Sequence, residues 1–467
     1  MPRPNIVFIF SDQQRADTMG HAGDPVAITP HLNALADEGT VFNQCFTSSP
    51  VCMPARASMM TGYQVHQHGV WAFADPDLRH GQSHVRNIRD AGYRTGVVGK
   101  THLWGHGPGH ANQHEQEMQD WGFVDARETT GPSESLRTDS LYTDHLASRG
   151  LLDAHRQYFE MYLGDPRPFP WELPPTPVPT EDHLDVFISR LAQEWIKDCD
   201  DEPFYLQVNF GGPHDPWDAP PEYRSLYNPD EMPLSMRDQR TGPLSPHVAL
   251  LLEHAPNKLD EMSIAQNQLL KANYYSKVTL IDDCVGAIRQ TLEERNLLDN
   301  TWIVFSSDHG EMLGDHGLLA KKVFYEGAVN VPCLFRPPNG QSQGINKGLT
   351  CHLDIVATLI DICGAEPLKN SDGKSILPVL TGASIDPQRP AVLSELGLPP
   401  SAFAMLRTSD YKLCADAKTR KPIEFYDLTE DPHELHNLVS HADYAERRQL
   451  LNEMLNPLLT NLDTSSW

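Results

Sequence analysis

The chain has 467 residues, of which 39% are hydrophobic and 21% are charged. This length exceeds the usual size of a single hydrophobic core, so we expect one large domain and a smaller one. The composition is ordinary for a globular protein and argues against disorder. The formal net charge of −26 argues against nucleic acid or an anionic membrane as a partner, because both would repel the protein.

The N-terminal apolar run, residues 6–10, fits a buried strand. It is too short for the hydrophobic region of a signal peptide or for a membrane span, and no other stretch approaches the roughly eighteen apolar residues that a span needs. We therefore expect a cytoplasmic protein. The eight cysteines show no CxxC spacing, so neither a zinc cluster nor a disulfide framework is predicted.

Short apolar runs alternate with longer amphipathic segments along most of the chain. This order predicts an α/β fold with a large, mostly parallel (mixed) sheet flanked by helices on both faces. The predicted strands are residues 6–10, 95–98, 204–210, 302–305 and 332–335. Thr29-Pro30 and Gly39 carry the start and stop signals of a helix. Further helices are predicted over residues 266–296 and 352–363.

The character of the chain changes near residue 385. Beyond it, residues 391–395, 402–407 and 423–426 predict an antiparallel sheet, closed by a helix over 444–462. We therefore divide the chain into a catalytic α/β domain, residues 1–385, and a smaller C-terminal α+β domain, residues 386–467. The proline-rich stretch 165–180 cannot form a regular helix or a central strand and is predicted to be a plain loop or part of a substrate lid.

Polar side chains follow four of the predicted strands. Ligands of open parallel sheets bind beyond the carboxyl ends of the strands. The residues delivered there are Asp12 and Gln13, Lys100 and His102, His214, and Asp308 and His309, with Lys321 slightly further along. One acid at a strand end usually caps a helix, but carboxylates, imidazoles and lysines from four strands indicate a functional site.

Asp12, Gln13, Asp308 and His309 form a candidate metal site. Carboxylate and amide oxygens are hard ligands suited to Ca²⁺, Mg²⁺ or Mn²⁺, and a histidine shifts the preference from Ca²⁺ towards Mn²⁺. The alternative is that Asp12 and Asp308 are only helix N-caps. For either residue alone the two interpretations are balanced, but as a pair beside an anion-handling motif they favour the metal site.

That motif is Cys52-Met53-Pro54-Ala55-Arg56. Pro54 predicts a helix that begins there and ends at Gly62. Cys52 would then lie just before a helix N-terminus, where N–H groups and the helix dipole favour negative charge, with Arg56 beside it. The spacing to the arginine is too short for a tyrosine-phosphatase loop. A buried structural cysteine is the other alternative, but it explains neither the proline nor the arginine.

These residues resemble the type I sulfatase family of the alkaline-phosphatase-like superfamily. Its maturation signature, Cys-x-Pro-x-Arg, is matched at Cys52, and its GK-x-H element by Gly99-Lys100-Thr101-His102. Similar stretches follow at Pro213-His214, at Ser307–Gly310 through Lys321, and at Phe425–Leu428. The Asp-Gln and Asp-His pairs are most similar to the branch of choline sulfatases and phosphonate monoester hydrolases. Those groups also carry an asparagine shortly after the maturation helix, which residues 69–73 lack.

The resemblance implies that a formylglycine-generating enzyme oxidises Cys52 to formylglycine, whose hydrate carries two hydroxyl groups. One hydroxyl would attack the sulfur of a sulfate monoester beside a divalent metal ion, and the other would expel sulfate. The implied catalytic residues are Cys52, Arg56, Lys100, His102, His214 and Lys321, and the metal ligands are Asp12, Gln13, Cys52, Asp308 and His309. Within this set His214 would serve the leaving oxygen and His102 would act as the base.

Hydrolysis of a sulfate monoester to an alcohol and inorganic sulfate is therefore the leading prediction. A phosphonate monoester or phosphodiester hydrolase with the same machinery is the alternative, because the net charge of the substrate does not separate the two. The predicted partners are a small anionic ester and the maturation enzyme, and a homo-oligomer stays open. A binding protein without turnover should lack the cysteine, the arginine or a metal carboxylate, and all of these are present.

Overall fold

The computed structural model describes residues 3–72, 81–164, 168–200, 202–237, 240–253, 259, 262–384, 389–398 and 401–459. Its large sheet has eight strands in the order β11-β2-β10-β9-β1-β8-β4-β6. Their bounds are β1 Asn5–Asp12, β2 Thr40–Phe42, β4 Arg94–Lys100, β6 Asp125–Thr129, β8 Phe204–Pro213, β9 Thr301–Ser307, β10 Cys333–Arg336 and β11 Gly344–Asn346. Only β10 runs antiparallel to its neighbours in this described sheet. The predicted mostly parallel, mixed sheet is confirmed.

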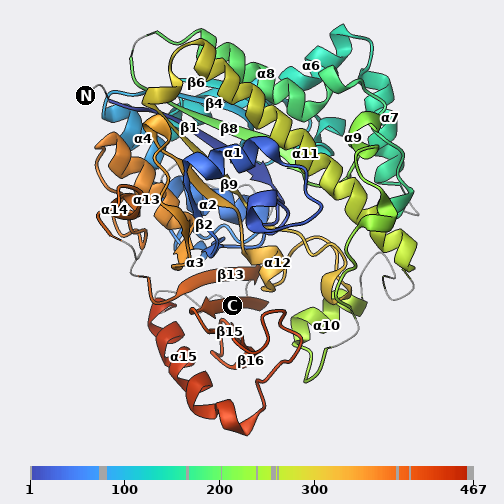
Figure 1. Cartoon of the computed structure of the whole chain (residues 1–467), viewed down its shortest axis with the longest axis vertical. Coiled ribbons are helices and arrows are strands. Elements are labelled where there is room, and N and C mark those ends of the chain that lie inside the picture. Colours follow the sequence, from blue (N-terminus) through green and yellow to red (C-terminus); the bar gives the residue numbers. More distant parts are fainter. Residues whose placement is uncertain are drawn as a thin grey trace.

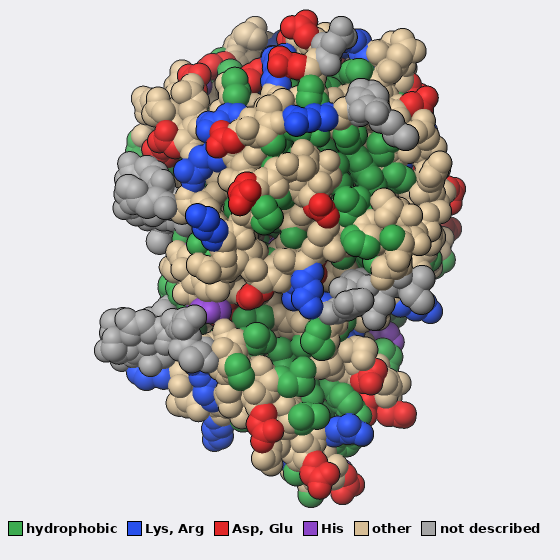
Figure 2. Space-filling model, turned by 90° about the vertical axis from the view of Figure 1, so that its left-hand side faces the viewer, with side chains coloured by type: hydrophobic (Ala, Val, Ile, Leu, Met, Phe, Trp, Pro, Cys, Tyr) green, Lys and Arg blue, Asp and Glu red, His purple; other side chains and the backbone are tan. Residues whose placement is uncertain are grey.

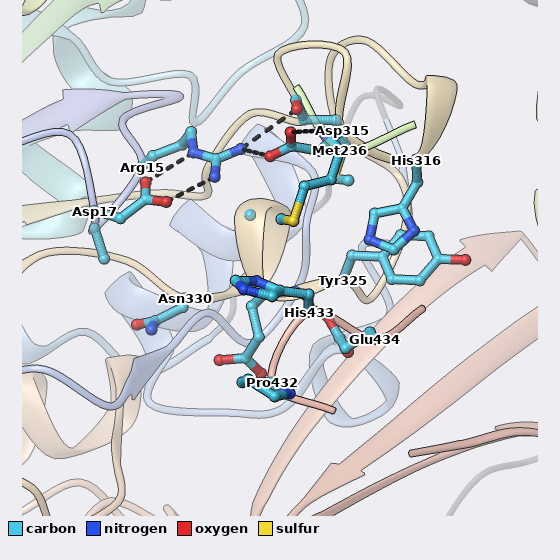
Figure 3. A pocket seen from close by; sticks show the side chains of 14 residues that line it. Arg15, Asp17, Met236, Asp315, His316, Tyr325, Asn330, Pro432, His433 and Glu434 are labelled. Carbon is cyan, nitrogen blue, oxygen red and sulfur yellow. Dashed lines mark hydrogen bonds and ion pairs between the residues drawn. The ribbon is translucent and has the colours of Figure 1, made fainter. Parts of the chain in front are cut away.

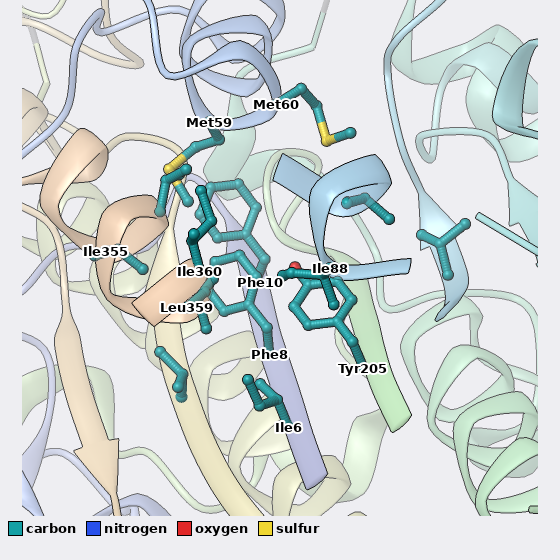
Figure 4. Packing of buried hydrophobic residues seen from close by; sticks show 14 of the residues in the cluster. Ile6, Phe8, Phe10, Met59, Met60, Ile88, Tyr205, Ile355, Leu359 and Ile360 are labelled. Atoms are coloured by element: carbon teal, nitrogen blue, oxygen red, sulfur yellow. The ribbon is translucent and has the colours of Figure 1, made fainter. Parts of the chain in front are cut away.

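Strand β1 lies near the middle of the sheet, and its side chains alternate between two hydrophobic cores. Ile6, Phe8 and Phe10 enter one core, where Figure 4 shows them packed against side chains of the surrounding helices. Val7 and Ile9 enter the other core. Because helices cover both faces, the strand is apolar along its length rather than alternating between polar and apolar residues.

The two faces are covered by different helices (Figure 1). The first core includes residues of α2 Cys52–Thr61, α4 His84–Asp90, α5 Glu115–Trp121 and α13 His352–Cys363. The second includes residues of α1 Pro30–Glu38, α8 Leu184–Lys197 and α11 Ile264–Glu294. The helices predicted to begin at Pro30 and to span 352–363 have the bounds that their sequence signals indicated.

The helix after the maturation signature begins earlier than predicted. Helix α2 starts at Cys52, with Val51 as its N-cap, rather than at Pro54. A proline is tolerated at this third position because the N–H groups of a first helical turn have no partner within the helix. Cys52 is therefore the first residue of the helix and not the residue before it, which leaves it at the positive end of the helix dipole.

The remaining helices are α3 Val65–His68, α6 Leu141–Ser148, α7 Leu152–Tyr162, α9 Pro221–Arg224, α10 Pro246–Glu253, α12 Glu326–Val329 and α14 Leu377–Leu380. Two-stranded pairs join β3 Cys45–Phe46 to β12 Thr350–Cys351 and β5 Gly109–His110 to β7 Thr138–Asp139. Within the proline-rich stretch, residues 168–180 contain the short 3-10 turn Pro170–Glu172, and residues 165–167 lie outside the described part. Among the described helices, none is both long and apolar enough to cross a membrane.

The C-terminal part, in red tones at the bottom of Figure 1, is a four-stranded antiparallel sheet with one helix. Its elements are β13 Val392–Leu398, β14 Ser401–Arg407, β15 Tyr411–Asp416, β16 Pro422–Asp427 and α15 Ala445–Leu458. Strand β15 was not predicted, because the buried Lys412 interrupts its apolar pattern. The predicted boundary between residues 385 and 386 lies outside the described residues and stays a prediction.

Figure 2 shows one face of the molecule, with acidic and basic side chains interspersed over it and hydrophobic side chains both in its upper and in its lower part. On the C-terminal helix α15, Leu450 and Leu458 are exposed. Charges of both signs are thus mixed on this face. A homo-oligomer stays a prediction.

Lys412 ties the C-terminal sheet to the large domain. Its buried ammonium group lies 2.8 Å from Glu326 and 2.5 Å from Glu434, and it donates to the carbonyl of Phe324 at 2.7 Å. Lys412→Met should lower the free energy of unfolding by about 3–5 kcal/mol, because two carboxylates would lose their shared cation. Urea unfolding measures this loss. The exposed Lys421→Met is the control, with an expected change below about 0.5 kcal/mol, and equal effects of the two variants would contradict the prediction.

Candidate active site

The carboxyl ends of β9, β1, β8 and β4 lie side by side, because these strands are consecutive neighbours in the sheet. Asp12 ends β1, Lys100 ends β4 and Asp308 follows β9. The side chains of all three are almost completely buried. The sheet topology therefore brings together polar residues that are nearly 300 positions apart, as the separation of Asp308 from Gln13 illustrates.

Four of these side chains form a closed network of charges. Lys100 Nζ lies 2.7 Å from Asp12 Oδ2, and Arg56 places its NH2 group 3.1 Å from the same oxygen. The Nε of Arg56 lies 2.9 Å from Asp308 Oδ2, and its NH1 group donates to the carbonyl of Lys100 at 2.7 Å. Each carboxylate thus has one oxygen paired with a cation, while Oδ1 of Asp12 lies 3.8 Å from Cys52 Sγ and Oδ1 of Asp308 lies 3.6 Å from His309 Nε2.

Cys52 lies at the centre of this arrangement. Its Sγ is 3.0 Å from His309 Nε2 and 3.8 Å from Asp12 Oδ1. The ligand atoms of Asp12, Cys52, Asp308 and His309 all lie within 4.8 Å of one another. The residues predicted from the maturation signature and from the strand ends therefore meet at one point.

The tautomer of His309 fits a metal ligand. Its Nδ1 lies 2.9 Å from the carbonyl of Gly310, which accepts the Nδ1 proton and leaves the lone pair on Nε2. Burial also lowers the pKa of His309, although Asp308 opposes this effect. A neutral imidazole beside two buried carboxylates is a donor set that fits Mn²⁺, Ca²⁺ or Mg²⁺.

Gln13 lies beside these four residues. Its backbone N–H donates to Asp308 Oδ1 at 3.0 Å. Its side-chain oxygen accepts a hydrogen bond from Lys321, and its Nε2 donates to Glu311. A donor on one side and a carboxylate on the other fix the orientation of this amide. The oxygen is therefore shared with Lys321, and its role as a metal ligand stays a prediction.

Opposing charges set the protonation of the central carboxylate. Burial alone would raise the pKa of Asp12, but Lys100, His214 and Arg56 together hold it well below its ordinary value. Asp12 therefore stays ionised across the physiological range. Asp12 is thus in the form that binds a divalent cation, since a metal ligand of this kind must be deprotonated.

His214 and Lys321 form the opposite wall of the site. Lys321 Nζ lies 2.9 Å from His214 Nε2, while Nδ1 of the histidine lies 2.7 Å from the carbonyl of Asp215. Burial and Lys321 lower the pKa of His214, but Asp215, Asp12 and a hydrogen bond with Cys52 outweigh them and raise it. The ring thus tends to hold a proton, as a general acid must.

His102 lies two residues beyond the end of β4 and is 5% exposed. Burial and then Lys100 depress its pKa well below the ordinary value of histidine, so the neutral form dominates. Its ring stacks on His106, with 4.9 Å between the ring centres. His106 therefore packs against His102 and supports the position of its ring.

Two residues at the site were not identified from the sequence. Asp215 lies 3.3 Å from Nδ1 of His214 through its Oδ1, and it accepts a hydrogen bond from Tyr162. Glu311 is buried behind Gln13, where it accepts hydrogen bonds from two backbone N–H groups as well as from the amide. Their only sequence signal was their closeness to His214 and His309.

A separate cavity of about 280 Å³ lies between the large domain and the C-terminal part (Figure 3). Arg15 marks one side of it, paired with Asp17 and Asp315, and the ring of His316 stacks on Tyr325 at 3.8 Å. None of the predicted catalytic or metal residues lines this cavity. Among the predicted catalytic residues His214 has the most exposed side chain, at 19%, so solvent reaches the site on its side.

The geometry and the motifs match a known family. The sequence matches the family described as Sulfatase over residues 4–365, and the family described as N-sulphoglucosamine sulphohydrolase, C-terminal, over residues 314–461. The chain therefore belongs to the sulfatase family, within the alkaline-phosphatase-like fold. It is a sulfuric ester hydrolase that acts on anionic esters.

Individual relatives agree with this assignment. The chain is 28% identical to the uncharacterized sulfatase YidJ of Escherichia coli K12, over 97% of this chain and 87% of the relative. It is 28% identical to the choline-sulfatase of Rhizobium meliloti, over 93% and 82%. The structure is similar to that of the phosphonate monoester hydrolase SpPMH of Silicibacter pomeroyi, with a TM-score of 0.82, 25% identity and coverage of 98% and 96%.

Glu128 on β6 supports the wall that carries His102, because it accepts hydrogen bonds from Thr101 and from Trp104. Burial raises its pKa to about 7, despite these two donors. An acid with a raised pKa stabilises the fold below its unfolded pKa, and this contribution is lost as the pH rises through about 7.

Glu128→Gln should therefore become more stable relative to the parent protein as the pH rises from 5 to 8, by at most about 3 kcal/mol. The glutamine oxygen still accepts both hydrogen bonds, so the change isolates the ionisation of residue 128. Urea unfolding of both proteins at pH 5 and pH 8 provides the measurement. A difference in stability that is the same at both pH values would contradict the raised pKa.

Proposed function

We propose that the protein hydrolyses a sulfate monoester, using formylglycine made from Cys52 and a divalent cation held by Asp12, Gln13, Asp308 and His309. The observation that carries the proposal is the position of Cys52, which lies 3.0 Å from His309 Nε2 and within a cluster of buried cations. A formylglycine-generating enzyme is the maturation partner that this proposal requires.

The charges of the site favour an anionic substrate. Arg56, Lys100 and Lys321 contribute three buried cations, and the carboxylates of Asp12 and Asp308 beside them are the ones that would hold the metal ion. Lys321 has three donor hydrogens, and the side-chain oxygen of Gln13 accepts one of them. A substrate oxygen can therefore accept another.

Formylglycine hydrate supplies two hydroxyl groups on one carbon, and the cation supplies positive charge that makes a hydroxyl more acidic. One hydroxyl oxygen would bond to sulfur as the S–O bond to the leaving group breaks, and Arg56, Lys100 and Lys321 would hold the non-bridging oxygens. His214 would give its Nε2 proton to the departing oxygen. The neutral His102 would then take the proton of the second hydroxyl group, so that the C–O bond to sulfate breaks and the aldehyde forms again.

A second candidate is hydrolysis of a phosphonate monoester or phosphodiester. It is favoured by the likeness to SpPMH, a phosphonate monoester hydrolase. A sulfate monoester presents three non-bridging oxygens, which suits three buried cations. A phosphonate monoester presents two such oxygens and one carbon, so one cation would face an apolar substituent. This difference places the sulfate monoester first.

Mass spectrometry of the peptide that contains Cys52 tests the nucleophile. In protein made together with a formylglycine-generating enzyme, we expect an aldehyde in place of the thiol. Cys52→Ala should lower kcat/KM by at least about 10³-fold, since it removes the nucleophile. A thiol that remains wholly unconverted in fully active protein would overturn the proposal.

Rates on two nitrophenyl esters separate the candidates. We expect kcat/KM for nitrophenyl sulfate to exceed that for nitrophenyl phenylphosphonate by at least about tenfold, which corresponds to about 1.4 kcal/mol of transition-state stabilisation. The leaving group is the same in both esters, so the comparison reports the group that is transferred. A preference for the phosphonate would make the second candidate the function.

A further inference from the structure

A second cluster of buried charges lies behind the wall that carries His214. Lys277 on α11 donates to Asp218 Oδ1 at 3.0 Å and lies 3.4 Å from Asp185 Oδ2 and 3.2 Å from His183 Nε2. All four side chains are at most 7% exposed. None belongs to the predicted catalytic or metal sites, and burying so many charges needs a reason, because each ion loses several kcal/mol of hydration.

One end of this cluster holds the turn that precedes His214. Asp185 Oδ1 accepts hydrogen bonds from the backbone N–H groups of Gly211 and Gly212, each at 2.9 Å. A β-carbon added at Gly212 would come within 2.7 Å of Asp185 Oδ2 and 3.1 Å of Lys277 Cε. Glycine is therefore required here for the carboxylate to approach the chain so closely.

The other end of the cluster holds the chain just after His214. Lys277 pairs with Asp218, whose backbone N–H donates to the carbonyl of Pro216 at 2.9 Å. The carbonyl of Asp218 in turn accepts from the backbone N–H of Thr176 at 2.8 Å. The segment from Gly211 to Asp218 is thus fixed at both ends, with His214 between the two anchors.

The ammonium group of Lys277 is shared by the two carboxylates of the cluster. Burial alone would lower the pKa of Lys277, but Asp218 and Asp185 outweigh it and raise the pKa. The lysine therefore keeps its proton and bridges the two carboxylates. In this way Lys277 joins the anchor before His214 to the anchor after it.

The geometry points to Asp185 and Lys277 as positioning residues for His214, which hold its imidazole at the leaving oxygen of the substrate. This inference rests on the proposed role of His214 as the proton donor. Neither residue touches the substrate, so they act through the segment 211–218. A misplaced acid matters most for esters with poor leaving groups, because these need the proton most.

If Asp185 and Lys277 only stabilised the fold, their loss would change the dependence of the rate on the leaving group differently. Loss of a buried carboxylate lowers stability in either case, but a structural residue would reduce the rate for all esters by a similar factor. Asp282 provides a matched control. It is also a fully buried carboxylate that accepts from two backbone N–H groups, those of His31 and Leu32, but it holds the start of α1 instead.

The experiment measures kcat/KM for a series of aryl sulfates, from nitrophenyl sulfate to esters of much less acidic phenols, with the full-length converted enzyme. Asp185→Ala should lose roughly tenfold more rate on the poorest leaving group than on nitrophenyl sulfate, since general acid catalysis contributes about 10²–10⁴-fold. For Asp185→Asn the loss of kcat/KM on the poorest leaving group should exceed the loss on nitrophenyl sulfate by about threefold. Its amide oxygen still accepts hydrogen bonds from both backbone N–H groups, but the neutral amide no longer attracts Lys277. Asp282→Ala should keep the leaving-group dependence of the parent enzyme.

A double-mutant cycle with His214→Ala completes the test. In that background Asp185→Ala should add no further dependence on the leaving group, because the residue it positions is gone. Equal losses on all esters, or a further dependence in the His214→Ala background, would overturn the positioning role. If Asp185→Ala does not fold, an unchanged leaving-group dependence in Asp185→Asn overturns it instead. If His214→Ala itself shows no such dependence, the proposed role of His214 has failed.

Discussion

The buried carboxylate of Asp12 is the constraint from which the rest of the site follows. Burying an ionised carboxylate costs several kcal/mol of folding free energy unless cations and hydrogen bonds replace its lost hydration. Lys100 and Arg56 provide those cations at 2.7 and 3.1 Å. Because Arg56 also pairs with Asp308, three strand ends and the N-terminal half of α2 are held to one point. The cations that stabilise the carboxylates also give an acidic protein, with a net charge of −26, a local cluster of positive groups for an anion.

Much of this site could be predicted from the sequence, because the carboxyl ends of neighbouring parallel strands must meet. That rule alone brought Asp12, Lys100 and Asp308 together. Strand β15 could not be predicted, since its Lys412 is buried by partners from distant segments. The cluster of Asp185 and Lys277 was missed for the same physical reason. No local pattern shows that a charged residue within an amphipathic helix faces inward to a turn far along the chain.

The exposure of the site suggests how its specificity is divided. The cations and the carboxylates are buried, and they meet the oxygen atoms that all anionic esters share. His214 has the most exposed side chain of the predicted catalytic residues, so in the proposed function the alcohol part of a substrate would extend past it and past Asp215. Specificity for the alcohol would then depend on loops near this opening, and the choice between sulfur and phosphorus on the buried cations. The two choices are physically separate, and a change in one need not alter the other.

One device recurs at three places in and around the described site. A single buried carboxylate accepts two backbone N–H groups: Asp308 from residues 13 and 309, Asp185 from residues 211 and 212, and Glu311 from residues 313 and 320. Loops lack the repeated hydrogen bonds of helices and strands, so their orphan N–H groups must find other acceptors. A carboxylate can satisfy two of them at once. Asp308 and Asp185 also pair with a buried cation, Arg56 and Lys277 respectively. The rigidity of the site thus comes from acidic side chains bonded to the backbone, and at Asp308 and Asp185 the same carboxylate also fixes a neighbouring cation in place.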